Sequence, residues 1–301
     1  MTLADALASG EFVVTAELGP PLNPDPEPVR RTARAFGPVV HSANVTDNQA
    51  ATVKISALAS AVWMLEEGLP PIMQVTTRDR NVMAIQADLL GAWALGVRSL
   101  LALSGDPLKV GPYAELTKPV ADFDSLGLVR LVSGMNDGHL AAGEKLEIPT
   151  GFLIGSAANP LVDTLEKIEQ KLAVGVHFFQ TNIVYDVDRF AEWFAPVVAA
   201  GVPGRAPVLV GVTPPRSTRM LEHMHKNIPG IEVDGATFAR MEGLQGEEAK
   251  AAGVEIAVDV VRRLRQVPGV AGVHLMAPGW EAEAVPRVAE GAAIGKGSPR
   301  G

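Results

Sequence analysis

The chain has 301 residues, of which 47% are hydrophobic and 20% charged, enough to bury one large core. Its 26 basic and 34 acidic residues give a formal charge of −8 without a basic stripe, so we expect no nucleic-acid partner. The absence of cysteine excludes disulfides, thiolate metal sites and cysteine nucleophiles. No apolar run approaches the roughly 20 residues of a membrane-spanning helix, and the acidic start lacks the basic region of a signal peptide. We therefore expect a cytoplasmic protein that does not bind a membrane.

Short β-rich runs alternate along the chain with longer segments of helical periodicity. The pattern predicts strands at residues 12–18, 39–45, 72–77, 99–103, 151–154, 178–181, 208–212 and 272–276. Strands that alternate with helices imply right-handed crossovers and a parallel sheet. Eight such units favour a (β/α)8 TIM barrel that forms a single domain over residues 1–290, with an open doubly wound sheet as the alternative.

Two connections are too long for ordinary barrel loops. Residues 107–148 include a predicted helix at 124–135, and residues 214–247 include a basic helix followed by a turn at 228–230. Long loops at the top of a barrel usually cover a ligand. Within the second connection, His223 and His225 are spaced i, i+2 and do not share a helix face, so we expect no metal site. The small, polar and glycine-rich residues 291–301 predict a flexible C-terminal tail.

Carboxylate and amide side chains stand where several predicted strands end. Glu17 is followed by Gly19-Pro20-Pro21, whose apolar rings would partly desolvate a carboxylate and raise its pKa, as suits a general acid; a solvated glutamate is the alternative. Asp106 follows the fourth strand, and the carboxyl ends of parallel strands are where such folds collect their chemistry. Gln180-Thr181-Asn182 ends the sixth strand with groups that can pair with the edge of a pterin or flavin.

Together these strand ends resemble those of the methylenetetrahydrofolate reductase family, from about residue 12 to residue 288. The resemblance lies in the order and spacing of Asn44-Val45-Thr46-Asp47-Asn48, Arg78-Asp79-Arg80-Asn81, Leu103-Ser104-Gly105-Asp106-Pro107, Phe123-Asp124-Ser125, Ala158-Asn159-Pro160 and Gln180-Thr181-Asn182 through Tyr185-Asp186. It implies a (β/α)8 barrel that binds FAD, accepts hydride from NADH or NADPH, and reduces 5,10-methylene-tetrahydrofolate to 5-methyl-tetrahydrofolate. It also implies a homo-oligomer.

The resemblance assigns roles by position. Glu17 resembles the family's general acid, which protonates folate N10, and Asp106 resembles the aspartate that contacts the pterin near the flavin. The positions where the family holds the flavin correspond to Thr46, Gln74, Ser104, Gly105, Asp106, Phe123, Asp124, Ser125 and Lys171. Asn182 stands where better-known members have glutamine. Because strand side chains alternate, we expect Gln180 and Asn182 to face one side of the strand and to bind one folate.

Two other functions are compatible with the same motifs. NADH could reduce the folate directly without flavin, or the chain could be a non-catalytic folate-binding subunit of a methyl-transfer complex. The presence of both Glu17 and Asp106 favours an enzyme, because a binding module does not need a positioned proton donor.

Overall fold

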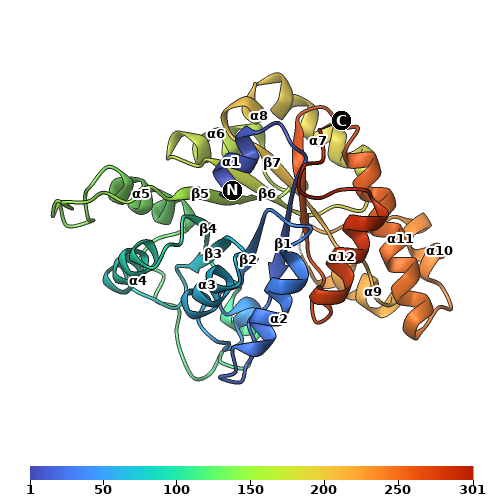
Figure 1. Cartoon of the computed structure of the whole chain (residues 1–301), viewed down its shortest axis with the longest axis horizontal. Helices are drawn as coiled ribbons and strands as arrows, with labels where there is room; N and C mark the ends of the chain where they lie inside the picture. The colour runs from blue at the N-terminus through green and yellow to red at the C-terminus, as the bar shows by residue number, and fades with distance from the viewer. Residues whose placement is uncertain (229, 301) are drawn as a thin grey trace.

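Eight parallel strands close into a barrel in the computed structural model, which describes residues 1–228 and 230–300 (Figure 1). The strands are β1 (Val13–Leu18), β2 (Ser42–Val45), β3 (Pro71–Thr76), β4 (Ser99–Leu103), β5 (Leu153–Ala158), β6 (Phe178–Ile183), β7 (Val208–Val212) and β8 (Val270–Leu275). Each strand pairs with the next, and β8 closes the barrel on β1 through pairs such as Val14 with Val273. The predicted (β/α)8 barrel is confirmed, and the open sheet is excluded.

Helices surround the barrel, with α4 and α5 on one side of Figure 1 and α11 and α12 on the other. The helices of the outer ring are α2 (Glu27–Phe36), α3 (Ala57–Glu66), α4 (Val82–Ala94), α5 (Ser125–Asn136), α6 (Leu165–Ala173), α7 (Val187–Ala199), α11 (Gly246–Leu264) and α12 (Glu281–Gly291). The shorter elements are α1 (Leu3–Ala8), α8 (Val202–Arg205), α9 (Thr218–Asn227), α10 (Gly235–Met241) and the 3₁₀ turns η1 (Gln49–Ala51) and η2 (Leu108–Val110). The basic helix predicted in residues 214–247 corresponds to α9, whereas the turn predicted at 228–230 includes residue 229, which lies outside the described residues.

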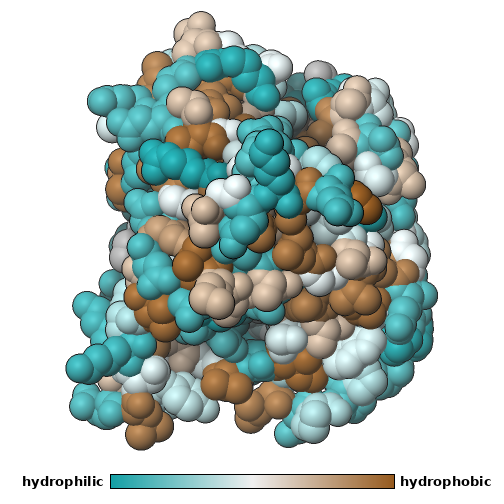
Figure 2. All heavy atoms as spheres, turned by 90° about the vertical axis from the view of Figure 1, so that its left-hand side faces the viewer, coloured by the Kyte–Doolittle hydropathy of each residue, from teal (hydrophilic) through white to brown (hydrophobic). Residues whose placement is uncertain are grey.

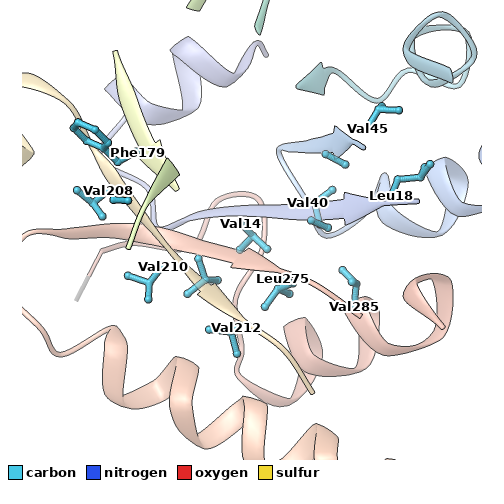
Figure 3. Close-up of a cluster of buried hydrophobic side chains, with 14 of the residues drawn as sticks. Val14, Leu18, Val40, Val45, Phe179, Val208, Val210, Val212, Leu275 and Val285 are labelled. Atoms are coloured by element: carbon cyan, nitrogen blue, oxygen red, sulfur yellow. The ribbon is translucent and has the colours of Figure 1, made fainter. Parts of the chain in front are cut away.

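Apolar side chains on the outer face of the barrel pack against this ring of helices. Val14 and Leu18 of β1, Val210 of β7 and Leu275 of β8 lie in one buried cluster with Val285 of α12 (Figure 3). Burial of a side chain of this size is worth roughly 1.5–3 kcal/mol. The cluster therefore accounts for the nearly continuous apolar pattern of these strands, since both faces of a parallel barrel strand are covered.

Inside the barrel, the side chains change from apolar to polar along the axis. At the amino ends of the strands, Val13, Ile72 and Phe178 lie in one buried cluster with Leu3 and Leu7 of α1, which covers that end. Further along β1, Thr15 and Glu17 lie on the same face as Val13, because side chains two residues apart share a face. The interior of the barrel thus leads from an apolar base to a polar opening.

Strand β5 is longer than the sequence predicts. The predicted strand ends at residue 154, but β5 continues to Ala158 through Gly155 and Ser156. The small residues make room for the ring of Phe178, since a Cβ atom on Gly155 would lie only 2.3 Å from its Cζ atom. The same small residues weaken the propensity signal for a strand.

Hydrogen bonds join the end of the chain to its start, and the flexibility that the composition predicts for residues 291–301 stays a prediction. The backbone N–H of Phe12 donates to the Ser298 carbonyl at 2.7 Å, and that of Gly297 donates to Glu11 Oε2 at 2.8 Å. The Arg300 guanidinium donates to the Leu7 carbonyl at 2.8 Å. These contacts use backbone groups, one carboxylate and one arginine, so hydrophobic periodicity does not reveal them.

Figure 2 shows the face of the molecule that carries α4 and α5, where hydrophobic side chains lie among hydrophilic ones. Met83 of α4 is one of the exposed hydrophobic residues of the chain. Within residues 1–228 and 230–300, no helix combines the length and the apolar character needed to cross a membrane.

Candidate active site

A polar cavity of about 680 Å³ opens at the carboxyl ends of the strands. Its volume lies in the range of about 300–1,000 Å³ that is usual for small-molecule sites. The side chains that line it include Glu17, Gln49, Gln74, Asp106, Lys171, Gln180, Asn182 and His274. A second cavity, of about 600 Å³, shares Ser104, Gly105, Asp106 and Asp124 with the first. The structure therefore brings together most of the side chains that the sequence singles out.

Glu17 is the most unusual titratable group of the cavity. Its side chain is buried at the end of β1, with Oε1 accepting from Gln49 Nε2 at 3.2 Å and Oε2 accepting from Gln74 Nε2 at 3.4 Å. Burial raises the pKa of Glu17 to about 7, and the charges of Glu281 and Asp106 add to this effect, whereas the two amides oppose it. A carboxyl group with such a pKa is substantially protonated near neutrality and can give up its proton, as a general acid must.

Asp106 holds a strained segment of the chain over the cavity. Its Oδ2 accepts from the backbone N–H of Ala50 at 2.6 Å. Asn48, Ala50 and Ala51 have left-handed φ angles of 49°, 55° and 51°, a conformation that costs roughly 1–2 kcal/mol for each such residue. Arg78 supports the arrangement by donating to the carbonyls of both Asn48 and Asp106, at 3.0 and 2.8 Å. Such strain persists only where surrounding contacts hold it, and it clusters at functional sites.

A buried amide pair lies below Glu17 in the barrel. Asn44 Nδ2 donates to Gln180 Oε1 at 2.7 Å, and Gln180 Nε2 donates back to Asn44 Oδ1 at 3.1 Å. Next to this pair, Thr15 Oγ1 and His274 Nδ1 lie 3.0 Å apart. Burial lowers the pKa of His274 to about 3, so its imidazole is neutral at physiological pH.

Our sequence analysis missed His274, which lines the cavity, and Thr15, which contacts His274 but does not line the cavity. The signal was present, since each is a polar residue within an otherwise apolar strand. Thr15 stands two residues before Glu17, and strand alternation places the two on one face. The sequence does not reveal that Thr15 and His274 meet, because β1 and β8 become neighbours only when the barrel closes.

Lys171 is buried beside the cavity. Its Nζ donates to the Ala157 carbonyl and to Asp163 Oδ2, both at 2.7 Å. Burial lowers the pKa of Lys171, although Asp163 opposes that effect. Asp163 also pairs with Lys167 at 2.7 Å, so two ammonium groups share one carboxylate at this wall of the cavity.

The remaining predicted residues divide between the two cavities. Ser104 and Asp124 line both, Ser125 lines the first and Phe123 the second. The Ser125 N–H donates to Ser104 Oγ at 3.2 Å, which joins the end of β4 to the start of α5. Except for Phe123, each of these residues has a polar side chain.

Thr46 lines neither of these two cavities, and its role in binding flavin stays a prediction. It is buried, and its N–H donates to the Leu18 carbonyl at 3.2 Å. Because β2 ends at Val45, strand alternation no longer sets the direction of the Thr46 side chain.

In the described part of the chain, no group of three or more His, Asp or Glu residues is arranged to hold a metal ion.

The amide pair supports a prediction about stability. We expect Asn44→Ala and Gln180→Ala each to lower the free energy of unfolding by about 1–3 kcal/mol, because each leaves a buried amide without its partner. The double variant should lose less than the sum of the two, with a coupling of about 0.5–3 kcal/mol. Urea unfolding of the four proteins measures this coupling, and additive losses would show that the pair does not act as a unit.

The fold and the cavity define a class: a TIM-barrel protein with a cavity lined largely by polar residues at the carboxyl ends of its strands. Within that class, the chain belongs to the methylenetetrahydrofolate reductase family, whose sequence model matches residues 2–290. The resemblance found in the strand-end motifs is thereby confirmed.

Two yeast proteins are among the relatives. Methylenetetrahydrofolate reductase 2 of Saccharomyces cerevisiae is 30% identical over 152 residues, which cover 49% of this chain and 24% of that protein. Methylenetetrahydrofolate reductase 1 of Schizosaccharomyces pombe is 26% identical over 197 residues, which cover 64% of this chain and 31% of that protein. The chain thus spans less than a third of the length of either relative.

A solved structure shares the fold over almost the whole chain. It is an uncharacterized protein from Clostridium thermocellum that binds two copies of 5-methyl-5,6,7,8-tetrahydrofolic acid. The TM-score is 0.66 at 15% sequence identity, and the match covers 97% of this chain and 98% of that one.

Proposed function

We propose that the protein reduces 5,10-methylene-tetrahydrofolate to 5-methyl-tetrahydrofolate with NADH or NADPH. The observation that carries the proposal is the buried Glu17, whose pKa is raised to about 7 in a cavity that also contains Asp106. Membership of the reductase family and the folate bound by the Clostridium thermocellum protein support the same substrate class.

The residues of the two cavities fit a flavin. The two cavities share Ser104, Gly105, Asp106 and Asp124, and together they have room for an extended ligand. Gln74, Ser104 and Ser125 offer the mixed donors and acceptors that the edge of a flavin ring requires. Lys167 and Lys171 are the ammonium groups in the lining of the first cavity, and they would favour its phosphates. Bound FAD would supply the relay of hydride from the nicotinamide to the folate.

Three carboxylates of the cavity, which would otherwise repel the phosphates of FAD, have partners within the protein. Asp47 is paired with Arg80, and Asp163 with Lys167 and Lys171. Asp124 accepts from the Gly127 N–H at the start of α5, at 2.8 Å. The negative charges of these three carboxylates are therefore largely compensated within the protein.

In the proposed reaction, the chain's own residues manage charge and the proton. The bond between N10 and the methylene carbon breaks, the Glu17 proton passes to N10, and a cationic iminium remains at N5. The negative charge of Asp106 favours that cation. Hydride, which carries two electrons, then adds to the methylene carbon and completes the methyl group. After proton transfer, the N–H groups of Gln49 and Gln74 stabilise the Glu17 carboxylate.

The cofactor is tested by the colour of the purified protein. We expect absorbance between 350 and 500 nm that NADH or NADPH bleaches without oxygen and that 5,10-methylene-tetrahydrofolate restores. Colourless protein that consumes NADH only when the folate is present, and is not stimulated by added FAD, would contradict the flavin and support direct hydride transfer. Protein that binds the folate but consumes no NADH or NADPH would contradict the enzyme and support a folate-binding subunit.

A further inference from the structure

Glu17 has two amide partners, Gln49 and Gln74, which belong to different parts of the fold. Gln74 extends from β3, within the closed barrel, whereas Gln49 belongs to the η1 turn outside it. Gln49 is exposed, yet its amide reaches back to the buried Glu17 Oε1 at 3.2 Å. The contact therefore depends on where the η1 turn is held.

Contacts from three directions hold that turn. Asp106 Oδ2 accepts from the Ala50 N–H at 2.6 Å, and Arg78 donates to the Asn48 carbonyl at 3.0 Å. The η2 turn lies against it so closely that a Cβ atom on Gly111 would be 2.3 Å from the Ala51 carbonyl oxygen. Because the turn contains left-handed alanines, it is not a conformation that the chain adopts without such contacts.

We infer that Gln49 is a positioning residue that sets the orientation and proton affinity of Glu17, and that the contact between Asp106 and Ala50 holds Gln49 in place. The inference deepens the proposed function, on which it rests for the role of Glu17 as the acid. A primary amide suits this task, because it can donate to the carboxylate and, after rotation, accept from the protonated acid.

The charged surroundings of Glu17 leave a defined role for this amide. Glu281 of α12 and Asp106 after β4 both raise the pKa of Glu17, in addition to burial. His274 of β8 is neutral, and Lys171 is paired with Asp163. Gln49 and Gln74 are the groups that lower the pKa of Glu17, because their N–H groups bind the charged form.

The test is a direct titration of Glu17 in the protein without added ligands. Carbon NMR of glutamate labelled at the carboxyl group follows the pKa, and the signal missing from Glu17→Gln identifies residue 17. We expect Gln49→Leu to raise the pKa of Glu17 by roughly one pH unit, as expected for loss of a hydrogen bond to a charged group. Gln170→Leu is the matched control, since it removes an amide-to-carboxylate bond at the surface of α6 and should leave the pKa of Glu17 unchanged.

A second pair of variants tests the role of Asp106. Ala50→Pro removes the N–H group that donates to Asp106, and proline cannot adopt the left-handed φ of residue 50. This variant should therefore raise the pKa of Glu17, as Gln49→Leu does. Ala50→Gly keeps the N–H and tolerates the φ, so it should not change that pKa. The inference is overturned if neither Gln49→Leu nor Ala50→Pro moves the titration of Glu17.

The same variants separate this inference from the proposed function. If the protein reduces the folate, the pH above which that step slows should rise in Gln49→Leu by the same amount as the NMR titration. Failure of the unmodified protein to reduce the folate would contradict the proposed function alone, because the NMR titration still decides the role of Gln49.

Discussion

Replacing Glu17 by glutamine is expected to slow folate reduction by about 10²–10⁴-fold, the usual effect of losing a general acid. Glutamine keeps the size of the side chain, and it retains contacts with both Gln49 and Gln74 when one of these amides rotates to accept, but it has no proton to give to N10. In the proposed flavin mechanism, reduction of FAD by NADH or NADPH should be unaffected, since that step needs no proton from residue 17. Stopped-flow measurement of the two half-reactions separates these effects, and an equal loss in both would make Glu17 a structural residue.

The same substitution is expected to stabilise the protein at high pH. The folded-state pKa of Glu17 is about 7, above its ordinary value of 4.5, so the folded protein binds this proton more tightly than the unfolded chain does. The resulting stability is fully present below about pH 4.5 and is lost as the pH rises through 7. Its size is about 3 kcal/mol, from the difference between the two pKa values.

Glutamine does not titrate, so Glu17→Gln escapes this loss. Between about pH 4 and pH 8, the free energy of unfolding of the variant should rise by about 3 kcal/mol relative to that of the unmodified protein. His274 has the opposite sign, because its lowered pKa gives stability that is lost as the pH falls, but both proteins contain it and its effect cancels. Urea unfolding at several pH values measures the difference, and a difference independent of pH would show that Glu17 is not buried as a charge-sensitive group.

The barrel could be predicted because periodicity is a local property. The strand at 208–212 has the same limits in the sequence and in the structure, since four of its five residues are branched and apolar. The prediction stopped short in β5, where the need for small residues comes from Phe178 on the next strand. The strand propensity of residues 155–158 does not reveal that the neighbouring strand β6 requires a small residue there.

The site was predictable only in part, for a similar reason. Glu17 and Asp106 lie at strand ends, which the sequence identifies, and both line the cavity. The pairing of Asn44 with Gln180 joins residues 136 positions apart, and the reach of Gln49 to Glu17 depends on a left-handed turn of alanines. Alanine gives no sequence signal for that conformation, unlike glycine or asparagine.

The most direct test of the proposed reaction is product analysis without oxygen. The protein is mixed with NADH or NADPH and 5,10-methylene-tetrahydrofolate, and the folates are separated and identified by mass. We expect 5-methyl-tetrahydrofolate in an amount equal to the nicotinamide cofactor oxidised, and a much slower yield from Glu17→Gln. Recovery of the 5,10-methylene-tetrahydrofolate unchanged from protein that demonstrably binds it would contradict the account.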